Sequence, residues 1–307
     1  HDIAENPELV EDSQKTLDSL IAQLDTQIED QQKILDQTVP IEGVEWYIAA
    51  QQRLTWAKLN LEKLKSQPQV IVVTENGEYN QSVERIQEYE FARAWVESVS
   101  QFYAIAREQS SKGLKSQTPF KDYYSQFIEN AEKGMELISE GDSEDAQRRL
   151  DAARMDQLNG RHLSAAMNAA SSLSLINANL IETDTSKDIR LELENKINSL
   201  EEKMGSDETK YAWARLYLDH AKYYLNSATY YREQNQGTTA ANNLSSGLTL
   251  AFLAENTFEV TNDVKEYYAG LPETAFSKLN GNGNSNGNNG GIIPISIGSD
   301  GKGSITV

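Results

Sequence analysis

The chain has 307 residues, contains no cysteine, and carries a formal net charge of −19 from 47 acidic and 28 basic residues. The missing cysteine excludes disulfides, zinc–thiolate sites, iron–sulfur clusters and thiol nucleophiles. Nucleic acids and anionic membranes bind clustered Lys and Arg, so this acidic composition argues against both kinds of partner.

Residues 1–67 are predicted to form an N-terminal helical hairpin. Its helices cover 8–37 and 44–65, and Val39–Pro40 ends the first because a residue before proline disfavours the helical conformation. Both helices carry apolar residues at spacings of three and four, which predicts one buried face on each. These residues are Leu17, Ile21, Leu24, Ile28 and Leu35, then Tyr47, Ala50, Leu54, Ala57, Leu61 and Leu64.

Residues 68–80 interrupt the helical spacing. The β-branched run at 70–73 and the turn-forming pair Asn76 and Gly77 predict an extended linker or a short strand in this segment.

Residues 81–270 are predicted to form an array of helical hairpins. Glycines 141, 160 and 237 are each followed within a few residues by an alanine and an apolar helix, a recurrence typical of stacked hairpins. The expected helices cover 82–111, 120–139, 143–158, 161–181, 189–205 and two halves of 207–260 joined at Gly237.

The pair of helices within 207–260 has the clearest seams. Three tyrosines at seven-residue spacing, Tyr217, Tyr224 and Tyr231, flank the first seam and are predicted to bind a partner. The seams consist of Ala214, Leu218, Ala221, Leu225 and Ala228, then Ala241, Leu244, Leu248, Ala251 and Phe258.

The end of the chain changes character. Residues 271–291 are predicted to be an Asn/Gly-rich linker, and 292–307 a small β-hairpin. A lone two-stranded ribbon is marginal in water, so we expect it to join either the 70–73 run or another molecule. Its alternating apolar residues, also predicted to bind a partner, are Ile293, Ile295, Ile297, Ile305 and Val307.

The predicted fold class is therefore all-α, an elongated array of antiparallel helical hairpins with TPR-like packing and a small C-terminal β-hairpin. Hydrophobic residues make up only 38% of the chain, which suits thin layers of helices that each bury a single stripe. The apolar runs fall short of about 18 residues, so we expect no transmembrane segment.

The polar residues do not form a recognisable catalytic or metal-binding motif. His220 lacks a second ligand one turn away, so we predict a hydrogen-bonded histidine between helices, and His162 is predicted to start a helix. Asp184, Ser186 and Asp188 resemble the start of a calcium loop, but Ile189 replaces the glycine that such a loop needs. We therefore predict helix capping there, with no catalytic residue, metal ligand or cofactor in the chain.

Aromatic residues gather in the second half of the array, and they have two interpretations. They are expected to pack between helices as part of the core, and the alternative is that they line a ligand groove. The residues concerned are Trp213, Tyr223, Tyr230, Tyr267 and Tyr268.

Four short patterns resemble the helical region that accompanies the protease domain in archaeal, surface-anchored Lon-like serine proteases. They are Arg53-x-x-Trp56-Ala57, Tyr89-x-x-Ala92-x-x-Trp95, the run from Gly160 to Ala166, and Tyr217-x-x-x-Ala221-x-Tyr223-Tyr224. The resemblance covers much of 45–265 and implies an exported accessory module. The Ser–Lys dyad of that family has no matching motif here, so it implies no catalytic residue.

We expect a non-enzymatic helical scaffold located outside the cytoplasm, secreted or at the cell surface, that binds proteins or assembles with itself through the 292–307 hairpin. One alternative is the helical accessory region of a Lon-like protease. The other is a small-ligand binding protein that uses an aromatic groove between helices.

Overall fold

The structure is a computed structural model that describes residues 7–66, 81–138, 143–184, 186–207 and 210–279. Both segments predicted to be extended, the 70–73 run and the 292–307 hairpin with Ile293, Ile295, Ile297, Ile305 and Val307, lie outside the described residues. The part that is described is mostly helical, and its nine α-helices pack in adjacent pairs, which confirms the predicted class.

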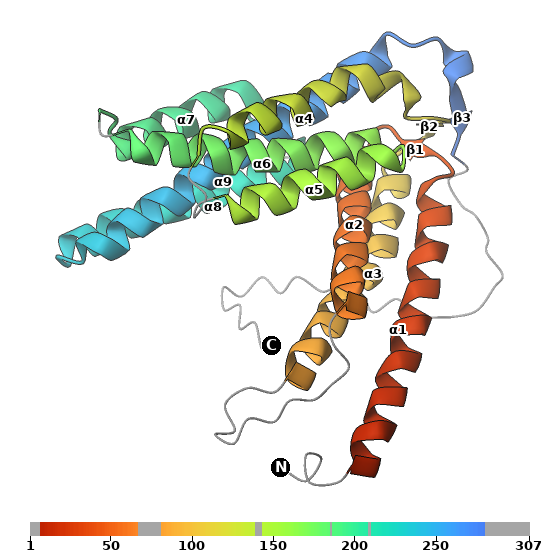
Figure 1. Ribbon diagram of the computed structural model, residues 1–307. Coiled ribbons are helices and arrows are strands. Elements are labelled where there is room, and N and C mark those ends of the chain that lie inside the picture. The colour runs from red at the N-terminus through yellow and green to blue at the C-terminus, as the bar shows by residue number, and fades with distance from the viewer. Residues whose placement is uncertain (1–6, 67–80, 139–142, 185, 208–209, 280–307) are drawn as a thin grey trace, which may run out of the picture.

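The helices form two groups that lie crosswise (Figure 1). We call the first group the arm and the second the body. The arm consists of α1 (Pro7–Leu35), α2 (Val44–Ser66) and α3 (Gln81–Glu108). The body consists of α4 (Lys121–Met135), α5 (Glu144–Leu158), α6 (His162–Thr183), α7 (Ile189–Met204), α8 (Ala212–Glu233) and α9 (Gly237–Ala269).

Within the arm, α2 packs far more extensively against α3 than against α1, although α1 contacts both. The close approach of α2 and α3 starts at Gly43, where an added Cβ would lie 2.4 Å from the carbonyl oxygen of Ala106. The apolar stripe of α2 predicts a buried face, but it does not say which helix covers that face. The helix nearest in sequence is therefore not its main partner.

Within the body, the two helices joined at Gly237 pair along their length as expected, and α5 pairs with α6. The long helix α9 also contacts α6 and α7, so the hairpins share it as a common support. The hairpins of arm and body do not follow a single axis (Figure 1). Regular TPR-like packing is not shown and stays a prediction.

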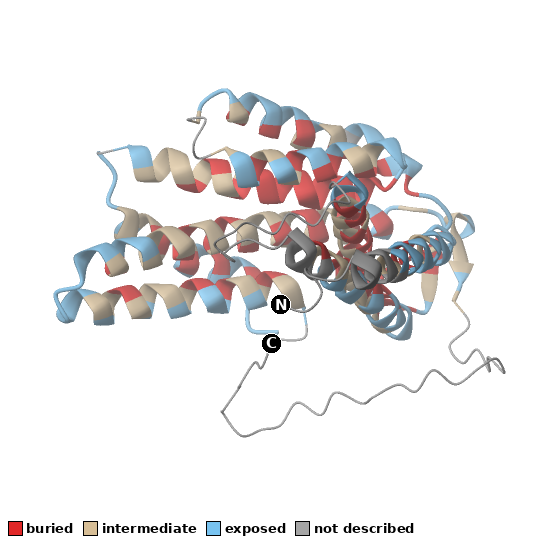
Figure 2. Ribbon diagram, turned by 60° about the horizontal axis from the view of Figure 1, so that its bottom comes forward, coloured by how far each residue is buried: buried red, intermediate tan, exposed pale blue. Residues whose placement is uncertain are grey.

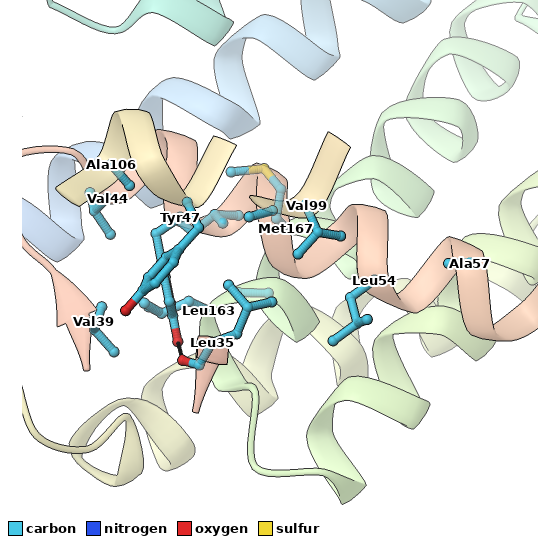
Figure 3. Packing of buried hydrophobic residues seen from close by; sticks show 14 of the residues in the cluster. Leu35, Val39, Val44, Tyr47, Leu54, Ala57, Val99, Ala106, Leu163 and Met167 are labelled. Carbon is cyan, nitrogen blue, oxygen red and sulfur yellow. Dashed lines mark hydrogen bonds between the residues drawn. The ribbon is translucent and has the colours of Figure 1, made fainter. Parts of the chain in front are cut away.

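Arm and body share one hydrophobic core, and buried residues gather where they meet (Figure 2). Tyr47 of α2 stands in this core among residues from α1, α3 and α6 (Figure 3). Its hydroxyl donates to the carbonyl oxygen of Leu35 at 2.9 Å and accepts from the side-chain amides of Gln51 and Gln117. Such a satisfied buried polar group fixes the position of α2 between the two groups of helices.

A small antiparallel sheet lies at one end of the body, with strand order β1-β2-β3. Its strands are β1 (Val39–Pro40), β2 (Lys112–Leu114) and β3 (Phe276–Lys278), and short 3-10 helices cover Thr118–Phe120 and Glu273–Ala275. Strand β3 falls inside the range 271–291 that is predicted to be a linker. Phe276 packs on Tyr268 and lies under the Lys112 ammonium at 4.4 Å, contacts that one aromatic residue in a polar stretch does not reveal.

Candidate ligand-binding groove

A groove of about 1120 Å³ lies between arm and body, and its walls come from α2, α3, α5, α6, α8 and α9. Along α2 its lining runs from Glu45 to Lys63, and at about 1.5 Å per residue this is a length of about 27 Å. The groove exists because the arm leaves the body at an angle while α2 stays in contact with both (Figure 1).

All four tryptophans of the chain are at this groove. Trp56, Trp95 and Trp213 line it, and Trp46 packs behind Trp213 with ring centroids 5.4 Å apart. Trp46 and Trp213 both make edge-to-face contacts with Phe102 of α3, at 5.5 and 5.7 Å. This favoured arrangement of rings joins α2 and α3 of the arm to α8 of the body.

Three arginines contribute to the walls of the groove. The Arg53 guanidinium lies 4.2 Å from the ring centroid of Trp95 and 5.4 Å from that of Phe102. Arg148 lies over Trp56 and also pairs with the carboxylate of Asp145 at 2.9 Å. The neighbouring Arg149 points inward, and its Nε is buried without an acceptor among the described residues.

Arg53, Arg149 and Tyr217 come from three different helices and line the groove together, and we call these three residues its centre. Burial lowers the pKa of both guanidinium groups, and neither has an ion pair or hydrogen bond with a described residue. Burial also raises the pKa of the Tyr217 hydroxyl, and the nearby positive charges of the two arginines act against that rise. The centre of the groove therefore presents hydrogen-bond donors and positive charges that form no ion pair with a described residue.

Three of the four acidic side chains that line the groove are engaged elsewhere, and the fourth, Glu144, is exposed at the start of α5. Glu45 accepts from the Lys265 ammonium at 3.1 Å and from the Trp213 main-chain N–H at 3.3 Å. Glu88 forms an ion pair with Lys63 of α2. Further down α5, Asp151 pairs with the guanidinium of Arg154 at 3.0 Å, so these carboxylates do not neutralise Arg53 or Arg149.

Only one of the predicted tyrosines reaches this site. Tyr217 lines the groove, whereas Tyr224 and Tyr231 are half-buried further along α8, beside the exposed rings of Tyr223 and Tyr230. Sequence reasoning missed Arg53 and Arg149 as site residues, because an arginine without an acidic partner is recognised only after folding. The sole sequence signal was that Arg53 and Trp56 occur one turn apart.

The other candidate residues lie outside the groove. Asp188 caps α7 by accepting from the main-chain N–H groups of Arg190 and Leu191, as predicted, and Asp184 accepts from Ser186. His162 is buried at the start of α6, and His220 is exposed on α8. Across the described ranges, no cluster of His, Asp and Glu has the arrangement needed to hold a metal ion.

Comparison of the chain with family models, curated proteins and solved structures finds no significant match. The resemblance to the helical region of Lon-like proteases therefore stays a prediction. Among the helices that the structure describes, none is both long enough and apolar enough to cross a bilayer.

Proposed function

We propose that this chain is a non-enzymatic protein-interaction module, and that the groove between arm and body holds a polypeptide segment of a partner. The observation that carries this proposal is the gathering of three tryptophans and three arginines on the walls of one groove, with the fourth tryptophan packed behind Trp213. Tryptophan and arginine are the residues over-represented among energetically dominant contacts of protein interfaces.

The size of the groove favours a polypeptide over a small metabolite. Small-molecule sites usually enclose about 300–1,000 Å³, whereas this groove has about 1120 Å³ and stays open along α2. Its length of about 27 Å corresponds to about eight residues of extended chain at about 3.3 Å each. The small-ligand alternative is therefore the weaker of the two interpretations.

The chemistry of the walls supports binding without catalysis. The described part of the groove contains no histidine and two serines: the Ser171 hydroxyl donates to the main-chain carbonyl oxygen of Met167 at 2.8 Å, and Ser143 is the N-cap residue of α5. A serine nucleophile needs a neighbouring base instead. The extracytoplasmic location, TPR-like packing, the accessory role beside a Lon-like protease and docking through 292–307 stay predictions.

Intrinsic fluorescence tests the proposal, because every tryptophan of the chain lies at the groove. Twelve-residue peptides without Trp or Tyr are selected from a random library on the full chain, and each is titrated while tryptophan emission is recorded. We expect saturable emission changes. Phe91 of α3 is an exposed aromatic residue that also lines the groove. Trp56→Ala and Phe91→Ala should each weaken binding about tenfold, which corresponds to about 1.4 kcal/mol of lost contact.

A matched control is Leu158→Ala, since Leu158 is also an exposed apolar residue, at 88% exposure, but does not line the groove. The Leu158→Ala variant should bind the selected peptides with the same affinity as the unchanged chain. The proposal is refuted if the selected peptides leave tryptophan emission unchanged. It is also refuted if the Trp56→Ala and Phe91→Ala variants bind the peptides as tightly as the Leu158→Ala control does. Failure to select any peptide refutes it as well.

A further inference from the structure

Arg53 and Arg149 are unusual for a chain with this charge balance. Acidic residues outnumber basic ones by 47 to 28, so a carboxylate partner is easy to supply. Arg154, five positions after Arg149 on the same helix, has two such partners, Glu132 and Asp151. Arg53 and Arg149 are more enclosed, and yet they have none within the described ranges. Desolvating a charge without a partner costs free energy, which a bound anion would recover.

Arg53 and Arg149 reach the same groove from different groups of helices. Arg53 is held on the arm by the Trp95 and Phe102 rings, while Arg149 approaches from α5 of the body. Tyr217 lies near both and adds a hydroxyl that stays protonated at neutral pH. Guanidinium groups bind carboxylates through two parallel N–H···O bonds, and a hydroxyl can occupy a remaining lone pair.

We propose that Arg53, Arg149 and the Tyr217 hydroxyl bind the side-chain carboxylate of an aspartate or glutamate in the polypeptide segment that occupies the groove. The rings of Trp95, Phe102 and Trp213 then contact the apolar neighbours of that residue. The inference rests on the proposed function and adds to it the chemical class of the partner: an apolar segment with an acidic residue at its centre.

A carboxylate fits this site better than a phosphate group does. A phosphorylated residue carries about two negative charges, so the net charge of −19 repels it more strongly at long range than a carboxylate, while its attraction to the two guanidinium groups increases as well. The aromatic walls also make desolvation of a doubly charged group more costly. The centre therefore selects a single negative charge surrounded by apolar side chains.

Three peptide pools of identical design test this inference on the full chain. Each pool holds twelve-residue peptides without Trp or Tyr, with varied Leu, Ile, Val, Phe and Ser around a fixed central residue. That residue is glutamate, glutamine or phosphoserine. Tryptophan emission gives the affinity of each pool. We expect the glutamate pool to bind at least tenfold more tightly than either of the other two.

Variants of the chain then show which residues produce the preference for glutamate-centred over glutamine-centred peptides. Arg53→Gln and Arg149→Gln should each reduce the ratio of glutamate to glutamine affinity to below about threefold. Arg154→Gln, on the same helix as Arg149 but outside the groove, should leave the ratio unchanged. Circular dichroism of each variant checks its fold, and the comparison of pools on the unchanged chain does not depend on any variant.

The outcomes separate the two proposals. Equal binding of the glutamate and glutamine pools, with a full emission change, overturns the carboxylate inference and leaves the groove as the binding site. Tighter binding of the phosphoserine pool also overturns it. Absence of binding by all pools, together with failure of the random selection, overturns both.

Discussion

Asp156 shows at the scale of one residue how arm and body are held together. Its carboxylate is fully buried and accepts from Arg161 Nε at 2.8 Å and from Asn168 Nδ2 at 2.9 Å. The hydroxyls of Thr55 on α2 and Ser164 on α6 donate to it as well. A buried charge is tolerated when it is paired and its lone pairs are used, and here that condition is met by residues from both groups of helices.

Replacing Asp156 by alanine should lower the free energy of unfolding by about 3–5 kcal/mol, because the Arg161 guanidinium would stay buried without its counterion. Urea unfolding followed by circular dichroism measures this loss. Asp151→Ala removes an exposed carboxylate from the same helix and should cost no more than about 1 kcal/mol. Adding Arg161→Met to Asp156→Ala should recover part of the loss, and no recovery would contradict the role of the uncompensated charge.

Arg149→Met should cost little or no stability, in contrast to Asp156→Ala. Methionine keeps much of the apolar stem and removes a desolvated charge that has no described partner, so we expect the free energy of unfolding to rise or to change by less than about 1 kcal/mol. Urea unfolding of Arg149→Met and of Arg161→Met compares the free energies of unfolding of the two variants. A loss above about 2 kcal/mol would mean that Arg149 supports the fold instead of a ligand.

At the scale of elements, close helix packing depends on glycine at one junction and not at another. Gly43 precedes α2, and a methyl group there would come within 2.4 to 2.9 Å of main-chain atoms of Ala106 on α3. Gly237 begins α9, and an added Cβ there would meet nothing within 4 Å. The first glycine therefore permits a contact between helices, whereas the second occupies open space.

Gly43→Ala should destabilise the protein by about 1–3 kcal/mol, since main-chain atoms cannot rotate away from the new methyl group. Gly237→Ala should stabilise it by up to about 1 kcal/mol, because alanine loses less conformational entropy in a helix. Thermal unfolding of both variants in one buffer tests the pair. Equal effects of the two substitutions would contradict this account of the α2–α3 contact.

The contrast between these elements also explains what the sequence could predict. Helix positions follow from apolar residues at spacings of three and four, which is local information, and all the predicted helices of the described part are present. Which helix covers each apolar stripe depends on residues far away in the sequence, so the extensive contact between α2 and α3 was not predicted. Strand β3 was missed because it is three residues long and pairs with β2, far away in the sequence.

The centre of the groove is the clearest case of information that only the fold supplies. Arg53, Arg149 and Tyr217 are separated by more than sixty residues at each step, and each alone has an ordinary surface interpretation. The heptad spacing of tyrosines identified Tyr217, but it gave Tyr224 and Tyr231 the same weight. The structure separates them, since Tyr217 alone of the three lines the groove.

At the scale of the whole molecule, a small cationic centre lies within a strongly acidic protein. The net charge of −19 repels an acidic peptide at long range, while Arg53 and Arg149 attract it at short range. Salt distinguishes these forces. The Debye length falls from about 30 Å at 0.01 M to about 8 Å at 0.15 M, so salt screens exposed charges more than enclosed ones.

The association rate constant of the glutamate-centred peptides should therefore increase several-fold between about 0.01 and 0.15 M NaCl, because screening removes the long-range repulsion. Their dissociation rate constant should change little, since it depends on the enclosed contact with Arg53 and Arg149. Stopped-flow recording of tryptophan emission measures both, and the glutamine-centred peptides, which are neutral, serve as the control with salt-independent rates. An association rate that falls with salt would show that attraction by the two arginines reaches beyond the groove and outweighs the acidic surface.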